Sequence, residues 1–241
     1  MCILFGREKI LIALGLVLVL SAEAQFLTWA RRNNPEYDRR KITYGFSIGL
    51  HNSAYQIRYS EEFVKSLDEL HSVMPRFKKG FSLGFLVNRR FNENFDLRLM
   101  PKAGFYDHEL VYNYTDRTSK SIQIETTMVE FPTLLKYKSA RRGNVRMYVV
   151  GGFTPGIEAS GKEFVTDDSD KIQIKKTNVS LEGGMGFDLY FPLFKFSPEI
   201  RYSRGLRNIL RPIEDPADVN IFRKSLNNIS TNTISIYLIF Q

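Results

Sequence analysis

The stretch ITYGFSIGL, residues 42–50, alternates apolar residues with small or polar ones without a break. A period of two over nine residues predicts a β-strand with one apolar face and one polar face. The same alternation returns along the rest of the chain, so we expect an all-β protein of about eight strands. The further apolar faces fall within residues 81–87, 95–99, 122–137, 145–153, 179–189, 194–202 and 234–240.

One of these stretches changes phase. Ile122 and Ile124 have even numbers, whereas the later apolar residues Phe131 and Leu135 have odd ones. A β-bulge adds one residue to a strand and turns every later side chain to the other face. We therefore expect a bulge near Val129.

The connections between the expected strands alternate in length. Long connections over 54–79, 107–120, 159–177 and 206–228 alternate with short ones over 88–94, 138–144 and 191–193. A transmembrane β-barrel alternates in this way, because its periplasmic turns are short and its extracellular loops long. An even strand number leaves both termini on the periplasmic side. We predict an eight-stranded antiparallel up-and-down transmembrane β-barrel of the outer-membrane type over residues 42–241.

The polar faces of the expected strands carry acidic and basic residues in nearly equal number. A soluble lipocalin-type barrel would need an apolar interior, and a soluble sandwich would need a second sheet over its apolar faces. In a narrow membrane barrel, paired charges fill the inside and apolar residues face lipid. We predict a lumen network of ion pairs with a structural role rather than a role in transport. Its members are Arg98, Glu130, Lys136, Glu182, Asp188, Glu199 and Arg201.

The N-terminus has the features of a cleaved signal peptide over residues 1–24. Arg7 and Lys9 precede the apolar stretch 10–20, and Ala22-Glu23-Ala24 follows it. The alternative is a membrane anchor, but this stretch is too short to span a bilayer. Cys2 is the only cysteine, so disulfides and thiolate metal sites are excluded from the exported chain. We expect residues 25–41 to form a basic periplasmic segment, and the outer membrane to be the location.

The net charge of +8 first suggests a nucleic-acid partner. The charges within the strands nearly cancel, however, and the basic residues concentrate before the first strand and in two short turns. These side chains can contact lipid phosphates, or they can dock a partner on the periplasmic side, which is our hypothesis; we predict no nucleic-acid partner. The docking candidates are Arg31, Arg32, Arg39, Arg40, Arg89, Arg90, Arg141 and Arg142.

A catalytic site is the weaker alternative. His51 and Ser53 end one expected strand, and Asp107 and His108 end another, which resembles the residue set of a hydrolytic or acyl-transfer site in a lipid A enzyme. Nothing in their spacing enforces a base between a nucleophile and an orienting carboxylate. No paired-histidine motif such as H-E-x-x-H occurs either. We predict no enzymatic activity, no metal and no cofactor.

Four segments carry a resemblance to a known family. They are NPEYDRRKITYGFSIGLHNSAYQI (34–57), GFSLGFLVNRRFNENFDLRLMPKAGF (80–105), VEFPTLLKYKSARRGNVRMYVVGG (129–152) and FSPEIRYSRGLRNIL (196–210). Small outer-membrane barrels of the Bacteroidetes share the patterns E-x-P-x-x-x-K-Y and P-E-x-R. The KSARRGN turn and the Tyr37-Asp38 entry resemble the PorT (SprT) family in particular. Thr133, where that family's pattern has an aliphatic residue, and the terminal Gln241 depart from it.

The resemblance implies a barrel required for type IX protein secretion and, in gliding species, for adhesin delivery. The implied partners are outer-membrane lipid and other type IX components on the periplasmic side, and no enzymatic activity comes with the family. Because a filled eight-stranded lumen leaves no path for a folded protein, we expect an accessory or assembly role rather than the wide pore. The alternatives are a small structural barrel of the OmpA/OmpX type and, more remotely, a lipid A-modifying enzyme.

Overall fold

The computed structural model describes residues 32–61, 63, 70–116, 118–164, 174–211 and 225–241. The expected signal peptide, residues 1–24, lies outside these ranges. Within them no helix is long and apolar enough to cross a membrane. The elements are a 3-10 helix η1 (Pro35–Arg39) and the strands β1 (Ile42–Tyr59), β2 (Leu70–Arg76), β3 (Lys78–Arg90), β4 (Phe95–Leu99), β5 (Lys102–Tyr114), β6 (Ser119–Glu130), β7 (Thr133–Lys138), β8 (Val145–Phe164), β9 (Thr177–Tyr190), β10 (Lys195–Gly205) and β11 (Leu226–Phe240).

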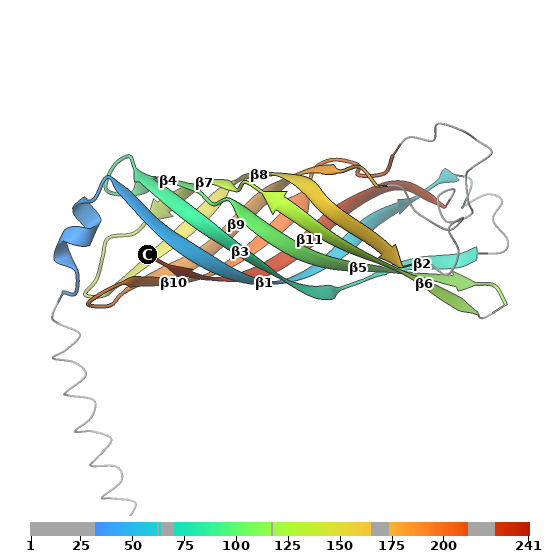
Figure 1. Cartoon of the computed structure of the whole chain (residues 1–241), viewed down its shortest axis with the longest axis horizontal. Helices are drawn as coiled ribbons and strands as arrows, with labels where there is room; N and C mark the ends of the chain where they lie inside the picture. Colours follow the sequence, from blue (N-terminus) through green and yellow to red (C-terminus); the bar gives the residue numbers. More distant parts are fainter. Residues whose placement is uncertain (1–31, 62, 64–69, 117, 165–173, 212–224) are drawn as a thin grey trace, which may run out of the picture.

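The strands close into a single antiparallel ring (Figure 1). Some strands of the ring are interrupted, so that two consecutive segments together form one strand of the wall. This holds for β2 with β3, for β4 with β5 and for β6 with β7, and the ring therefore has eight strands. β1 pairs with β11, which closes the barrel, and every other pairing joins consecutive strands of this ring of eight. The predicted eight-stranded up-and-down barrel is confirmed.

Two of the interruptions follow from proline. Pro101 separates β4 from β5 and Pro132 separates β6 from β7; a proline has no N–H to donate to a neighbouring strand. The wall nevertheless stays closed there. The Met100 N–H donates to the Pro132 carbonyl at 3.0 Å, and the Phe85 N–H to the Pro101 carbonyl at 3.0 Å.

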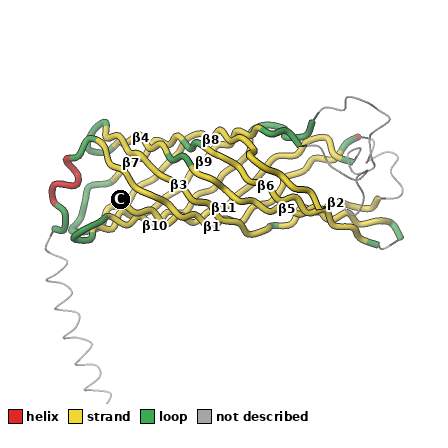
Figure 2. The backbone as a smooth tube through the Cα atoms, in the orientation of Figure 1, coloured by secondary structure: helices red, strands yellow, loops and turns green. Residues whose placement is uncertain are grey.

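The two ends of the barrel differ. Residues 91–94, 139–144 and 191–194 form tight turns at one end, which we call the short-turn end. The helix η1 and the C-terminus lie there too, and the opposite long-loop end carries the tips of β2 and β6 (Figures 1 and 2). Both ends of the described chain thus lie on the same side, as an even number of strands requires.

An apolar belt surrounds the half of the barrel next to the short turns. Phe85, Met147 and Ile200 point outward there, and Phe85 is 74% exposed. The aromatic residues beside the short turns border this belt: Phe95 lies 5.0 Å from Tyr137 between ring centroids, and similar pairs join Phe191, Phe194 and Phe240. An exposed apolar surface of this extent is what a lipid environment requires.

The expected bulge near Val129 is wrong. Even-numbered residues face inward all the way from Ile122 through Glu130 to Lys138. The alternation of inward and outward side chains therefore continues without a shift. What changes is the environment. Near the long-loop end the inner face is apolar, whereas within the belt it is charged, and this exchange imitates a phase shift in the sequence. The register shift opposite Thr127 and Met128 falls on β8, which has one extra residue there.

The long connections are also shorter than predicted. β1 continues to Tyr59 and β5 to Tyr114, so the strands extend well past the apolar belt. Here the apolar residues point inward and form a core of their own. Its members are Tyr55, Val73, Leu110, Tyr112, Ile122, Ile124, Ile209, Leu210, Leu226 and Ile229. The alternation is reversed relative to the belt, so the expected long connections include seven of these core residues, from Tyr55 to Leu226, which the structure places in the interior.

This reversal predicts different effects at two neighbouring positions. Ile122→Asp places a carboxylate in the apolar core, where the native side chain is fully buried, and we expect it to reduce the free energy of unfolding by at least 2 kcal/mol, roughly the cost of an unpaired buried polar group. Ser121→Asp, on the exposed face of β6, is the matched control and should leave stability unchanged. Urea denaturation of the folded barrel measures both. Equal stability of the two variants would contradict an inward-facing Ile122.

Candidate functional site

The lumen within the apolar belt is filled by charged side chains, with Glu199 at the centre. Its carboxylate accepts a hydrogen bond from Arg98 Nη1 at 2.6 Å and another from Arg201 Nε. The Tyr148 hydroxyl donates to the same carboxylate at 2.6 Å. Arg201 continues the chain of contacts to Glu182 at 3.2 Å. Glu199 and both guanidinium groups are almost completely buried.

A second group surrounds Asp188, closer to the short turns. Lys136 Nζ lies 2.7 Å from this carboxylate, and the Ser197 hydroxyl donates to it at 2.6 Å. Lys195 approaches the same carboxylate at 3.9 Å. Lys136 Nζ also lies 3.5 Å from the centroid of the Tyr148 ring. Tyr148 therefore connects this group to the Glu199 group.

A third group holds Glu130 toward the long-loop end. Lys102 Nζ lies 3.0 Å from the Glu130 carboxylate, and the Tyr106 hydroxyl donates to it at 2.6 Å. Lys102 also donates to the Tyr237 hydroxyl at 2.6 Å, and Arg201 lies over the Tyr237 ring. The structure thus brings all seven residues of the expected lumen network into ion pairs.

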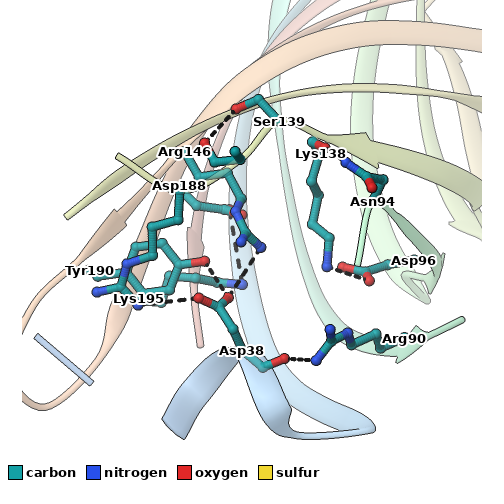
Figure 3. Close-up of polar contacts among 12 residues, drawn as sticks. Asp38, Arg90, Asn94, Asp96, Lys138, Ser139, Arg146, Asp188, Tyr190 and Lys195 are labelled. Atoms are coloured by element: carbon teal, nitrogen blue, oxygen red, sulfur yellow. Dashed lines mark hydrogen bonds and ion pairs between the residues drawn. The ribbon is translucent and has the colours of Figure 1, made fainter. Parts of the chain in front are cut away.

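At the short-turn end, Asp38 of η1 is held by groups from the barrel rim; we call this arrangement the Asp38 clasp (Figure 3). The Tyr190 hydroxyl donates to its carboxylate at 2.8 Å, Arg146 at 3.2 Å and Arg141 at 3.3 Å. Arg90 donates to the Asp38 main-chain carbonyl. Beside the clasp, Lys138 pairs with Asp96 at 2.6 Å.

The clasp holds η1 across the barrel end with Tyr37 turned inward. The Tyr37 ring meets the Tyr190 ring edge to face at 5.9 Å, and Lys195 Nζ lies 4.7 Å from its centroid. Burial raises the pKa of the Tyr37 phenol to about 12, so this group stays neutral. The cavity left between η1 and the lumen is about 20 Å³, room for roughly one water molecule. The short-turn end of the lumen is therefore closed.

The clasp changes the interpretation of the docking candidates. The Arg141 side chain is only 5% exposed, lies over the Tyr190 ring and belongs to the clasp, as does Arg90. The prediction that Arg141 is available to a partner is therefore wrong, and Arg90 is only partly exposed. Arg31 lies outside the described residues. The remaining candidates, Arg32, Arg39, Arg40, Arg89 and Arg142, are exposed.

The structure also brings together part of the weaker catalytic set. The Ser53 hydroxyl lies 3.0 Å from His108 Nε2 and 2.9 Å from the Thr233 hydroxyl. Asp107, however, is the neighbour of His108 on β5, so its side chain points to the opposite face of the strand. There it accepts a hydrogen bond from Gln123 at 3.0 Å. His108 Nδ1 has no hydrogen-bond partner among the described residues. A nucleophile and a base are therefore present without the carboxylate that would orient the base.

Several residues of the network were not predicted from the sequence. Tyr106, Tyr148 and Tyr237 share the parity of the charged inner faces, and this parity alone could have assigned them to the lumen. Asp38 gave no such signal, because η1 lies outside the alternating strands. The Tyr37-Asp38 pair carries part of the family resemblance, but its contacts with Tyr190 and Arg146 depend on the closed ring.

The central triad predicts a large cost for losing Glu199. Glu199→Gln removes the charge that two buried guanidinium groups share, and breaking such a pair costs about 3–5 kcal/mol. We expect a corresponding fall in the urea midpoint of unfolding. The control is Glu36→Gln, which breaks an exposed pair with Arg39 and should have no measurable effect. A Glu199→Gln barrel as stable as the wild type would contradict the account of the lumen.

The clasp predicts a local effect for Asp38. Asp38→Asn removes the charge that Arg141 and Arg146 share, and we expect η1 to detach while the barrel stays folded. Limited trypsin digestion should then cut after Arg39 or Arg40 several times faster than in the wild type. Asp116→Asn, at the long-loop end, is the control. Unchanged cleavage in Asp38→Asn would show that the clasp does not hold η1.

Comparison with known proteins identifies the family. A model for the outer membrane protein beta-barrel domain matches residues 24–211, and no curated protein sequence matches the chain. Among solved structures, the chain is similar to Neisserial surface protein A (13% identity over 83% of this chain and 98% of that chain, TM-score 0.40). It is similar to OprG from Pseudomonas aeruginosa (11% identity, 81% and 93%, TM-score 0.44) and to Ail of Yersinia pestis (12% identity, 83% and 99%, TM-score 0.36). The family model covers most of the chain, and the chain accordingly belongs to the outer membrane protein beta-barrel domain family and resides in the outer membrane.

Proposed function

We propose that this barrel is an accessory or assembly component of the type IX protein secretion apparatus rather than its pore. The proposal rests first on the resemblance of four segments to the PorT family. The observation that carries the mechanism is the closed short-turn end, where paired charges and η1 leave a cavity of only about 20 Å³. A folded protein has no route through such a lumen, so a role in secretion has to act through contacts with other components.

The short-turn end would face the periplasm, as short turns do in outer-membrane barrels. Five arginines there, Arg32, Arg39, Arg40, Arg89 and Arg142, are exposed. Guanidinium groups bind carboxylates and phosphates in planar, bidentate pairs. We propose that this exposed basic rim docks an acidic surface of a periplasmic or inner-membrane component, while Arg90 and Arg141 maintain the clasp.

We also propose that the chain has no enzymatic activity. Ser53 and His108 are in contact, but Asp107 lies on the other side of the wall. Without an orienting carboxylate the histidine lacks the third member of a triad. A purely structural role, as in small barrels of the OmpA/OmpX type, is the second candidate, and the continuous lumen network favours it.

Deletion in the native host separates these roles. If the chain acts in secretion, deletion should abolish release of the type IX cargo set, and the wild-type gene should restore it. A fragile envelope with normal secretion would support the structural role instead. Altered lipid A acylation would support the enzyme and contradict both.

The docking surface is tested by reversing charge in the complemented strain. Arg89→Glu with Arg142→Glu should reduce secretion roughly tenfold or more, since each reversal removes about 1 kcal/mol or more of attraction. The matched control is Arg58→Glu with Arg76→Glu, two exposed positions nearer the long-loop end, which should secrete normally. Heat-modifiable migration must show that both variants are folded. Normal secretion by the Arg89/Arg142 variant would refute docking at this rim.

A further inference from the structure

Above the charged network the lumen is hollow. A cavity of about 300 Å³ lies between the ion pairs and the apolar core of the long-loop end, which is at the lower limit of the volumes of small-molecule sites. Its deep part is polar and is lined by Ser53, His108, Thr233 and Ser235. Nearer the long-loop end it is lined by Tyr55, Ile124, Ile174 and Ile209, and its lining also includes the charged residues Glu158, Lys175, Lys176 and Arg211. The cavity therefore has hydrogen-bonding groups at its deep end and an apolar wall beside them.

The polar end contains an unused hydrogen-bonding group. His108 is 4% exposed and lines the cavity, and its Nε2 is taken up by Ser53 while its Nδ1 has no partner among the described residues. A buried polar atom without a partner costs free energy, and a ligand that supplies one recovers it. The His108 ring is held in place by stacking on Tyr55 at 4.1 Å between centroids.

The buried charges beside the polar end are already matched. Lys102 pairs with Glu130, and Arg201 pairs with Glu182. An additional charge at this end would therefore be unpaired and poorly hydrated, which is unfavourable. The head group that fits best is polar but uncharged, such as a hydroxyl or an amide.

Beside the cavity, the barrel wall also borders a hollow on the outer surface. The β3–β5 ladder stops at the pair Phe81 and Phe105, and the His51 side chain closes the next step by donating from Nε2 to the Phe105 carbonyl at 3.1 Å. Gly80 is required here, because a Cβ would lie 2.3 Å from that carbonyl oxygen. A hollow of about 400 Å³ on the outer wall includes Phe81 and Phe105.

Tyr106 and Thr126 line both the inner cavity and this outer hollow. The lumen cavity and the outer hollow, which Phe81 and Phe105 also line, therefore meet the same two side chains in the wall. A ligand with an apolar tail partitions into the surface of that hollow, whereas a fully polar solute does not.

We propose that the lumen cavity binds a small, uncharged amphiphile. Its polar head hydrogen-bonds to His108 Nδ1 beside Ser53, and its apolar tail lies against Tyr55, Ile124 and Ile209. The site is independent of the proposed role in secretion, because it lies on the far side of the ion-pair network from the basic rim.

Octan-1-ol is a suitable probe, with octanoate as its charged analogue. Titration of the full barrel in phosphatidylcholine nanodiscs, corrected with empty nanodiscs, should show saturable binding of octan-1-ol and binding at least about tenfold weaker for octanoate. The ring ¹⁵N resonances of His108 should shift in step with binding. Equal affinity for the two probes would refute the uncharged head group.

Two variants with the same new side chain locate the site. Thr126→Phe fills the cavity from β6 and should abolish saturable binding, whereas Thr133→Phe adds the same ring to the exposed face of β7 and should leave it intact. Both must migrate as folded barrels, and the wild-type resonance of His108 keeps the proposal testable if Thr126→Phe does not fold. Absence of saturable binding by the wild type, or binding without a shift at His108, would overturn the proposal.

Discussion

The structure depends on the contact of one carboxylate with two guanidinium groups. Glu199 lies between Arg98 and Arg201 in the middle of the lumen, and all three side chains are almost completely buried. Because lipid surrounds the belt, charged side chains can only point inward, and once inside they must be paired to offset their lost hydration. The contacts extend from Glu199 through Tyr148 to Asp188 and through Arg201 to Glu182. The register of the strands and the closure of the ring bring these groups together, and the Asp38 clasp closes the short-turn end.

The result is a barrel with two different halves. The half inside the belt has apolar residues outside and ion pairs inside, and η1 closes its end through Asp38. The extended half has a conventional apolar interior, with Ile122 and Leu110 fully buried. The lumen cavity lies at the boundary, where neither charges nor apolar side chains fill the space. A barrel filled in this way does not provide a passage for a folded chain.

Much of this architecture could be predicted from the alternation of residues and the alternation of loop lengths. The inward direction of Arg98, Lys136 and Glu199 follows from strand parity alone. Parity could not show where the belt ends, however, because the outward environment changes from lipid to water along one uninterrupted strand. The exchange of apolar residues from outside to inside therefore imitates a bulge near Val129. The role of Arg141 was equally hidden, since it depends on η1 returning across the barrel end, a contact between residues about a hundred positions apart.

Paired charges fill the lumen, and η1 closes its short-turn end. Single-channel recording of the purified barrel in a planar lipid bilayer measures this closure. The wild-type chain should show no large or stable conductance, because the cavity at the short-turn end holds roughly one water molecule. A wide, persistently open conductance from the folded wild-type barrel would contradict both the closed lumen and the accessory role.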